Sequence, residues 1–216
     1  MSNIQIINAD CMEVMAKMKD KEFDLAIVDP PYGIKRDVGF VGFGGFGEPI
    51  ARRQYKGGWD NERPPSKYFQ ELLRVADKVI IFGGNYFADL LPQGNHWVVW
   101  DKQNTMPTFG DAELIWTNID RNSVKIKVHQ WNGLLGKEKQ SRIHPTQKPV
   151  ALYQWLLKNY AKQGDRILDT HGGSCSSAIA CDIMGFDAVI FEIDKDYFEA
   201  ALDRFNRHKQ QQVLAL

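Results

Sequence analysis

The chain has 216 residues, which is enough for one large domain with a well-buried core. Its 27 lysines and arginines balance 27 aspartates and glutamates, which argues against a protein that coats nucleic acid by charge alone. The balance does not exclude a local basic face, because binding depends on where the charges lie. The apolar runs are too short for a transmembrane helix, and the first residues lack the features of a secretory signal. The three cysteines have no paired spacing, so we expect reduced thiols in a cytoplasmic protein and no metal site.

Strand and helix patterns alternate along the chain, starting with a short strand over residues 4–7 and a helix over about 11–18. The other expected strands cover residues 23–28, 78–82, 97–100, 112–117, 124–128, 166–169 and 187–192. The other expected helices cover residues 66–75, 149–160, 174–184 and 196–208. This alternation predicts a single α/β domain over residues 1–216, with a mostly parallel sheet that helices cover on both faces.

Asp29-Pro30-Pro31-Tyr32 directly follows the buried strand over residues 23–28, at the sheet edge where open α/β folds place their ligand sites. An exocyclic amine on adenine or cytosine is a poor nucleophile because its lone pair is delocalised, so an enzyme that methylates it must accept hydrogen bonds from it. Asp29 offers a carboxylate and Pro30 a backbone carbonyl, and the two prolines hold both acceptors in place. Tyr32 offers a face on which an extruded base can stack. A plain turn with a capping aspartate is the alternative, which the adjoining apolar strand disfavours.

Residues 167–177 are typical of a strand, a glycine turn and a helix, in which the backbone approaches a ligand closely and the helix N-terminus presents free N–H groups. The turn lacks the G-x-G-x-x-G pattern of dinucleotide folds. Glu192 lies 23 residues after Asp169, at the end of the next strand, where a carboxylate is well placed to hold ribose hydroxyls. The pair predicts a cofactor that contains a nucleoside but no pyrophosphate, and a structural turn is an equally weighted alternative.

Two further segments have both a functional and a structural interpretation. Asp10 follows the first strand and, taken alone, is better explained as the N-cap of the next helix, although beside the other sites it is a candidate acceptor for an adenine amine. The segment His144-Pro145-Thr146-Gln147-Lys148-Pro149 mixes an imidazole, a hydroxyl and a cation before a helix, and a proline-rich connection is its alternative.

Together these motifs resemble the β-class DNA amino-methyltransferases, which act on N6 of adenine or N4 of cytosine, and short phage and prophage members are especially similar. That family carries D/N/S-PP-Y/F/W near its N-terminus, HPTQKP before the cofactor domain, a DPFxGSGTT-like loop, and an acid at the end of the next strand. This sequence has DPPY at 29–32, HPTQKP at 144–149, DTHGGSCSS at 169–177 and FEID at 191–194, so the likeness spans nearly the whole chain. Thr170-His171 replaces the family's Pro-Phe and Cys175 replaces a glycine, which puts the affinity for the cofactor in doubt.

The resemblance implies a Rossmann-like, class I methyltransferase fold with a seven-stranded sheet and a circularly permuted motif order. It implies that Asp29 and Pro30 bind the target amine, with Pro31 and Tyr32 completing the catalytic motif. The residues that it implies for binding S-adenosylmethionine are Asp10, Cys11, Asp29, His144, Thr146, Lys148, Asp169, His171, Gly173 and Glu192.

Basic residues gather in two regions that we expect to contact DNA. The first ends the glycine-rich stretch over residues 33–58, which has too many glycines for a helix or strand and is expected to be a flexible loop. The second lies in residues 118–143, where this family inserts its target-recognition region; it is small here, so recognition could use a short site or a homodimer. The expected DNA-binding residues are Arg52, Arg53, Lys56, Arg121, Lys125, Lys127, Lys137, Lys139 and Arg142. A solvated surface is the equally weighted alternative for such charge runs.

The expected function is site-specific transfer of a methyl group from S-adenosylmethionine to N6 of adenine in DNA, directly and in line, to a base flipped out of the duplex. Asp29 favours adenine, because the N4-cytosine enzymes more often carry serine at that position. The alternatives are an N4-cytosine methyltransferase, and a non-catalytic module that binds DNA or the cofactor.

Reversing the charge of Arg52 and Arg53 together should weaken DNA binding and flatten its dependence on salt, because fewer counterions are released from the phosphates. Titration of DNA at several salt concentrations measures both effects. Unchanged binding would remove this segment from the DNA interface.

Overall fold

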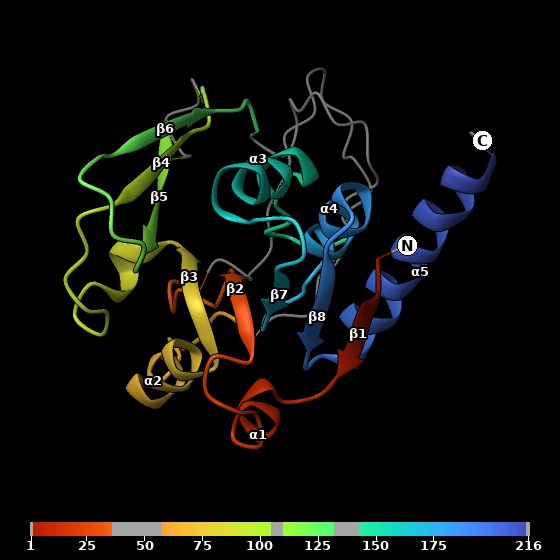
Figure 1. Ribbon diagram of the computed structural model, residues 1–216, viewed down its shortest axis with the longest axis horizontal. Helices are drawn as coiled ribbons and strands as arrows, with labels where there is room; N and C mark the ends of the chain where they lie inside the picture. The colour runs from red at the N-terminus through yellow and green to blue at the C-terminus, as the bar shows by residue number, and fades with distance from the viewer. Residues whose placement is uncertain (1, 36–57, 105–109, 132–142, 215–216) are drawn as a thin grey trace, which may run out of the picture.

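A computed structural model of the protein describes residues 2–35, 58–104, 110–131 and 143–214 (Figure 1). The strands are β1 (Ile4–Asn8), β2 (Phe23–Val28), β3 (Ala76–Phe82), β4 (Trp97–Asp101), β5 (Ala112–Thr117), β6 (Lys125–Val128), β7 (Arg166–Asp169) and β8 (Asp187–Glu192). The helices are α1 (Cys11–Met15), α2 (Ser66–Val75), the 3-10 turn η1 (Gly84–Phe87), α3 (Val150–Tyr160), α4 (Ser176–Met184) and α5 (Lys195–Leu214).

All described strands join one sheet in the order β1-β8-β7-β2-β3-β5-β4-β6. Five of the pairings are parallel, and only β5 runs antiparallel to its two neighbours, β3 and β4. The expected α/β fold with a mostly parallel sheet is therefore confirmed. Among the described residues the sheet has eight strands, as many as the sequence patterns indicated and one more than the resemblance implied. The short strand β6 pairs with β4 at the outer edge.

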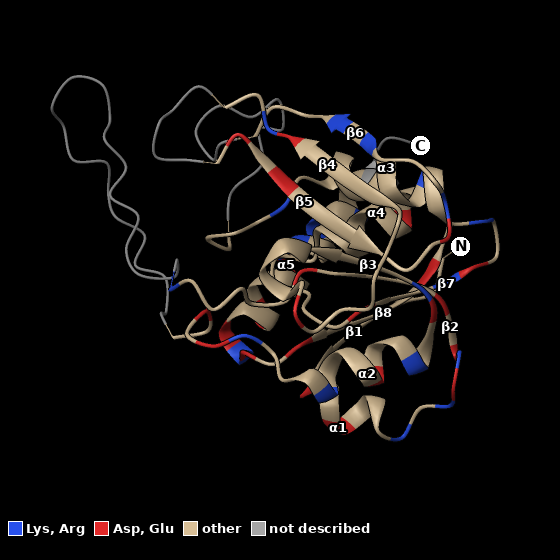
Figure 2. Ribbon diagram, turned by 90° about the vertical axis from the view of Figure 1, so that its left-hand side faces the viewer, with Lys and Arg blue, Asp and Glu red and all other residues tan. Residues whose placement is uncertain are grey.

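Helices cover both faces of the sheet, as Figures 1 and 2 show. β2 is apolar at every position from Leu25 to Val28 because both of its faces are covered there. Leu25 and Ile27 point into the core beneath α3, α4 and α5, whereas Ala26 and Val28 point into the core beneath α1 and α2. A strand buried on both faces needs apolar side chains at every position rather than alternate ones.

Two strands far apart in the sequence place the two loop motifs side by side. β2 pairs in parallel with β7, with Leu25 opposite Ile167 and Ala26 opposite Leu168. The carboxyl ends of parallel neighbours lie at the same edge, about 4.8 Å apart. Asp29, just after β2, therefore lies beside the start of the glycine turn that follows β7.

The helix boundaries differ from the expected ones where tertiary contacts intervene. α1 ends at Met15 instead of continuing to Met18. The Arg74 guanidinium of α2 donates hydrogen bonds to the backbone carbonyls of Met15 and Met18, at 2.7 and 2.8 Å, in place of a further helical turn. α5 instead extends to Leu214. No pattern in the sequence predicted η1, which starts after Gly83 in the left-handed conformation at φ 65°.

Within the described ranges, none of the helices combines the length and the apolar character that crossing a bilayer requires. The same residues contain no group of three histidine, cysteine or acidic side chains arranged to hold a metal ion.

Truncating Ile80 to alanine should lower the free energy of unfolding by about 2–5 kcal/mol, because the side chain is lost from a packed central strand. Ile80 on β3 is 1% exposed, whereas Ile126 on the edge strand β6 is 66% exposed. Ile126→Ala is the matched control, with an expected change within about 0.5 kcal/mol. Urea unfolding measures both, and equal losses would contradict the assigned cores.

Candidate active site

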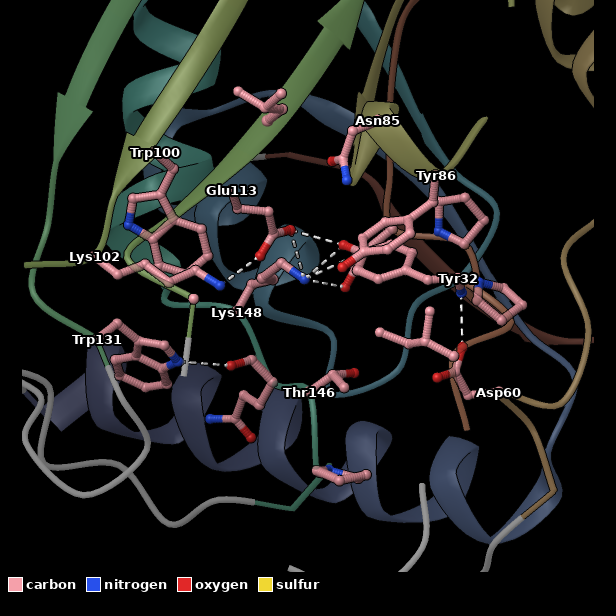
Figure 3. A pocket seen from close by; sticks show the side chains of 18 of the residues that line it. Tyr32, Asp60, Asn85, Tyr86, Trp100, Lys102, Glu113, Trp131, Thr146 and Lys148 are labelled. Carbon is pink, nitrogen blue, oxygen red and sulfur yellow. Dashed lines mark hydrogen bonds and ion pairs between the residues drawn. The ribbon is translucent and has the colours of Figure 1, made fainter. Parts of the chain in front are cut away.

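A cavity of about 330 Å³ opens at the carboxyl end of β2 (Figure 3). Its polar lining includes Asp29, Lys102, Glu113, Thr146 and Lys148. Its aromatic lining comprises Tyr32, Trp59, Tyr86, Trp100 and Trp131. Flat aromatic surfaces around a few convergent polar groups suit a planar, polar ligand.

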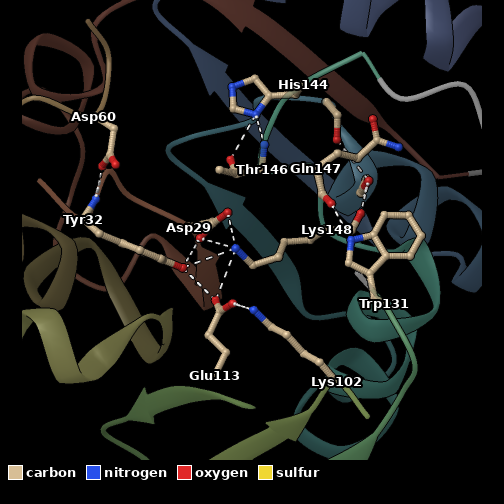
Figure 4. A network of polar contacts seen from close by, with 12 residues as sticks. Asp29, Tyr32, Asp60, Lys102, Glu113, Trp131, His144, Thr146, Gln147 and Lys148 are labelled. Atoms are coloured by element: carbon tan, nitrogen blue, oxygen red, sulfur yellow. Dashed lines mark hydrogen bonds and ion pairs between the residues drawn. The ribbon is translucent and has the colours of Figure 1, made fainter. Parts of the chain in front are cut away.

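Asp29 is the centre of a buried network of charged groups (Figure 4). The Lys148 ammonium donates to both of its carboxylate oxygens, at 2.9 and 2.8 Å. Lys148 also lies 3.2 Å from Glu113, which forms a second ion pair with Lys102 at 2.8 Å. The Tyr32 hydroxyl lies 2.7 Å from an oxygen of Asp29 and 2.7 Å from an oxygen of Glu113. Two cations thus balance two carboxylates, so the cluster can be buried without excess charge.

Burial and pairing shift the pKa values of this network in opposite directions. Burial raises the pKa of Asp29, although the Lys148 ammonium opposes that shift. Burial also disfavours ionisation of Glu113, but Lys148 and Lys102 outweigh it and lower the pKa to about 2. Burial alone would lower the pKa of Lys148, yet the two carboxylates raise it above its ordinary value. The pKa of Tyr32 is raised well above its ordinary value by burial and by both carboxylates. Tyr32 is therefore a neutral hydrogen-bond donor.

The Asp60 carboxylate fixes the backbone that follows Asp29. The buried side chain of Asp60 accepts hydrogen bonds from the backbone N–H groups of Tyr32, at 2.7 Å, and Gly33, at 2.9 Å. Tyr86 stacks on the Tyr32 ring with a centroid distance of 4.8 Å. A Cβ atom on Gly83 would come within 2.5 Å of that ring, so glycine is required there.

The segment over residues 144–149 connects the cavity to the glycine turn. The backbone carbonyl of Lys148 accepts a hydrogen bond from the Ser176 hydroxyl at 2.7 Å, and Arg204 of α5 donates to the same hydroxyl at 3.0 Å. His144 lies between the two sites: its ring is 3.8 Å from where a Gly173 Cβ would be, and its Nδ1 lies 3.1 Å from the Thr146 hydroxyl. Ion pairing directs the Lys148 side chain to the Asp29 side of this connection.

Glu192, at the end of β8, lies against the glycine turn. One oxygen of Glu192 accepts from the Gly173 N–H at 2.8 Å and the other accepts from the Asp194 N–H at 2.9 Å. Gly173 has a positive φ of 50°, which favours glycine. Asp169 is buried and accepts hydrogen bonds from Ser177 at 2.6 Å and from the His171 N–H at 3.0 Å. Burial raises the pKa of Asp169 to about 7.

The departure at Thr170-His171 has a local physical explanation. The Tyr68 hydroxyl of α2 lies 2.7 Å from the Thr170 hydroxyl, which in turn lies 2.9 Å from His171 Nδ1. The rings of Tyr68 and His171 meet edge to face at 5.3 Å. Burial lowers the pKa of His171 to about 4, so its ring is neutral at physiological pH and occupies the place of an aromatic side chain.

Asp10 acts as the N-cap of α1, accepting from the Met12 N–H at 2.8 Å. This is the structural interpretation that the sequence favoured for Asp10 in isolation. Burial, with the neighbouring Asp10 charge, raises the pKa of the Cys11 thiol to about 12. Cys11 is therefore a protonated, unreactive thiol.

Some predicted site residues line the cavity and others do not. Asp29, Pro30, Pro31 and Tyr32 line it, as do Thr146 and Lys148. The lining does not include Asp10, His171, Gly173 or Glu192, which belong to the adjoining turn and strand ends. The two groups meet through the β2–β7 pairing and through His144.

The expected DNA-binding residues are only partly within the described chain. Arg52, Arg53, Lys56, Lys137, Lys139 and Arg142 fall outside it. Lys125 and Lys127 lie on β6 at the outer edge of the sheet (Figure 2). Lys127 and Arg121 lie over the rings of Trp155 and Tyr160, at 5.9 and 5.2 Å.

Sequence reasoning missed several residues of the site, among them Asp60, Tyr86, Lys102 and Glu113. Glu113 and Lys102 belong to the β4–β5 region, which has no recognisable motif. Only the antiparallel pairing of these strands brings Glu113 to the cavity. Asp60 and Tyr86 likewise give no signal beyond being a polar and an aromatic residue near turns.

An open α/β sheet that carries a carboxylate–proline turn and a glycine turn on neighbouring strands fits the DNA amino-methyltransferases that the sequence motifs resemble. A family model described as DNA methylase matches residues 93–203, slightly more than half of the chain. The chain belongs to this DNA methylase family.

Individual relatives are distant but cover the chain well. The type II methyltransferase M2.MboI of Moraxella bovis is 24% identical over 94% of this chain and 88% of its own length. M.HpaI of Haemophilus parainfluenzae is 24% identical over 94% of this chain and 74% of its own length. A solved M1.HpyAVI–SAM complex has a TM-score of 0.60 at 20% identity, covering 93% of this chain and 99% of that one. The cytosine-N4-specific PvuII methyltransferase has a TM-score of 0.61 at 13% identity, covering 94% and 86%.

The raised pKa of Asp169 predicts a pH dependence of stability. The folded protein retains the Asp169 proton up to about pH 7, whereas the unfolded chain releases it near its ordinary value of 3.8. The stability that this proton contributes is complete below pH 3.8 and is lost as pH rises through 7. Relative to Asp169→Asn, the wild type should lose roughly 1.4 kcal/mol per pH unit across this window.

Urea unfolding of both proteins at several pH values measures this difference. The lowered pKa of His171 acts with the opposite sign between 6.5 and 4, and its effect cancels because both proteins retain it. Parallel pH profiles for the wild type and Asp169→Asn would contradict the assignment.

Proposed function

We propose that this DNA methylase transfers a methyl group from S-adenosylmethionine to the exocyclic amine N6 of adenine in DNA. The observation that carries this function is the Asp29 carboxylate, which lies at the tip of the central strand β2 and lines an aromatic cavity beside the glycine turn. The solved complex of M1.HpyAVI with SAM, which shares the fold, supports the choice of cofactor.

The residues of the glycine turn fit this cofactor. Gly173, with its positive φ, leaves room above the backbone, and Glu192 keeps acceptor capacity for ribose hydroxyls beyond its two backbone contacts. Asp169 adds a buried carboxyl group without an ion-pair partner among the described residues, which suits a cationic ligand. His144 and Thr146 border the path from this turn to the cavity.

S-adenosylmethionine, when bound, supplies a methyl carbon on a positively charged sulfur. The Asp29 carboxylate and the Pro30 carbonyl accept the two N–H groups of the amine and turn its lone pair toward that carbon. The chemistry that the bound cofactor would supply is transfer of this carbon to the nitrogen, with the neutral thioether as the leaving group and one amine proton released to water. Tyr32 and Tyr86 form the aromatic wall against which the flipped base stacks.

Adenine is favoured over cytosine by Asp29, because the N4-cytosine enzymes more often carry serine at the first position of this motif. The cytosine-N4-specific PvuII methyltransferase shares the fold, so cytosine N4 is the second candidate. We further propose that the protein forms a homodimer and that Lys125 and Lys127 contact DNA.

Asp29→Ala should abolish methyl transfer while leaving cofactor binding largely intact, because Asp29 lies in the cavity and the turn residues are unchanged. Asp77→Ala on β3 is a matched control, since that aspartate is exposed and remote from the cavity. Labelled-methyl incorporation into DNA and calorimetric cofactor titration measure the two effects. Turnover in Asp29→Ala would remove the role given to this carboxylate.

Nucleoside analysis of the methylated DNA then separates the candidates. We expect N6-methyladenosine, whereas N4-methylcytosine would establish the second candidate. Cofactor binding with no methyl incorporation by the wild type would indicate a non-catalytic module.

A further inference from the structure

Glu113 shares the Tyr32 hydroxyl with the catalytic carboxylate. The hydroxyl oxygen lies 2.7 Å from Asp29 Oδ1 and 2.7 Å from Glu113 Oε1. A phenol has one O–H, so it donates to one of these acceptors at a time. The hydroxyl therefore has two orientations, each with a carboxylate acceptor at 2.7 Å, which differ by rotation about its C–O bond.

Binding of the target amine to Asp29 needs the orientation in which the Tyr32 hydroxyl donates to Glu113. Asp29 Oδ1 already faces two donors, the Tyr32 hydroxyl and the Lys148 ammonium. An incoming amine that donates to Asp29 competes with them. A buried hydroxyl that simply lost its acceptor would oppose binding, because unsatisfied buried donors are costly. Glu113 removes that cost, since the hydroxyl reaches it without movement of any heavy atom.

The charge on Glu113 keeps this second acceptor available. Burial opposes its ionisation, but Lys148 and Lys102 hold its pKa at about 2. The pKa of Tyr32 is raised well above its ordinary value, chiefly by burial. Across the working pH range the pair thus consists of a carboxylate and a neutral phenol, which is the combination that the exchange requires.

We propose that Glu113 is a positioning residue that takes over the Tyr32 hydrogen bond when the target amine binds, so that the amine takes the place of the Tyr32 hydroxyl at Asp29 Oδ1. We call this exchange the handover, and its catalytic consequence rests on the proposed function. The sharing of the hydroxyl between Asp29 and Glu113, on which the handover depends, is a property of the free protein and can be measured without turnover.

A double-mutant cycle between positions 113 and 32 tests the catalytic consequence. Glu113→Ala should lower kcat about ten- to a hundredfold in the protein that retains Tyr32, which is the size of one hydrogen bond to a charged acceptor. In a Tyr32→Phe background the same substitution should lower kcat by a factor several times smaller, because only the loss of charge balance remains and no hydroxyl competes for Asp29. The KM for DNA should change less than kcat in both backgrounds. Equal losses in the two backgrounds would overturn the handover and leave Glu113 a structural role.

Two controls separate the hydroxyl from the ion pairs. Glu113→Gln keeps the shape and a weaker acceptor, so it should show the same dependence on residue 32 with a smaller loss, even if the alanine variant folds poorly. Lys102→Met breaks the 2.8 Å ion pair with Glu113 but retains the acceptor. Its effect should be the same with Tyr32 present and in the Tyr32→Phe background. A Lys102→Met effect that depended on residue 32 as strongly as that of Glu113→Ala would contradict the specific role of Glu113.

Titration of the Asp29 carboxyl by carbon-13 NMR tests the handover in the free protein, with the signal assigned by its loss in Asp29→Asn. Removing Glu113 lowers the Asp29 pKa in any background, because a neighbouring negative charge is lost. With Tyr32 present the pKa should fall further, because the hydroxyl then donates to Asp29 all the time and stabilises its charged form.

The kcat measurements and the Asp29 titration distinguish failure of the handover from failure of the proposed function. Equal falls of the Asp29 pKa with Tyr32 present and in the Tyr32→Phe background would overturn the handover whatever the activity. A larger fall with Tyr32 present, in a protein that methylates no DNA, would support the handover and contradict the proposed function instead.

Discussion

The ion pair between Lys148 and Asp29 joins the segment before α3 to the turn after β2, and the candidate site depends on it. Both groups are almost fully buried, with side chains 7% and 14% exposed. Such burial is tolerated because Glu113 and Lys102 complete a neutral cluster of two cations and two carboxylates. Removing one member would leave an uncompensated charge, so the four side chains constrain one another's positions.

The cluster also determines how the Asp29 carboxylate is presented to the cavity. Asp29 is not a bare acceptor, because its oxygens already receive bonds from Lys148 and Tyr32. These contacts within the protein fix its geometry, which is what preorganised hydrogen bonding requires. The rigid parts are the backbone, held by Asp60, and the Tyr32 ring, packed against Tyr86. Only protons need to move among the acceptors.

The sequence predicted those parts of the fold that depend on local patterns. The apolar residues 25–28 and the prolines after them defined β2 and its end, and the strand patterns before Asp169 and Glu192 indicated the ends of β7 and β8. Glu113 could not be found this way, because its role depends on the register of β5 against β3 and β4 rather than on its neighbours in sequence. The pairing of Thr170-His171 with Tyr68 joins residues 102 positions apart, so the sequence could identify that departure but not explain it.

The strand order has a consequence for how the protein is made. β1 and β2 are the first strands synthesised, yet β7 and β8 lie between them in the sheet. The emerging chain must therefore leave a gap two strands wide, with the inner edges of β1 and β2 unpaired, until residues 166–192 leave the ribosome. Such non-local pairing is slow and exposes strand edges to wrong partners. A nascent chain that stalls before β7 carries the whole Asp29 turn but has neither a closed sheet nor a glycine turn beside it.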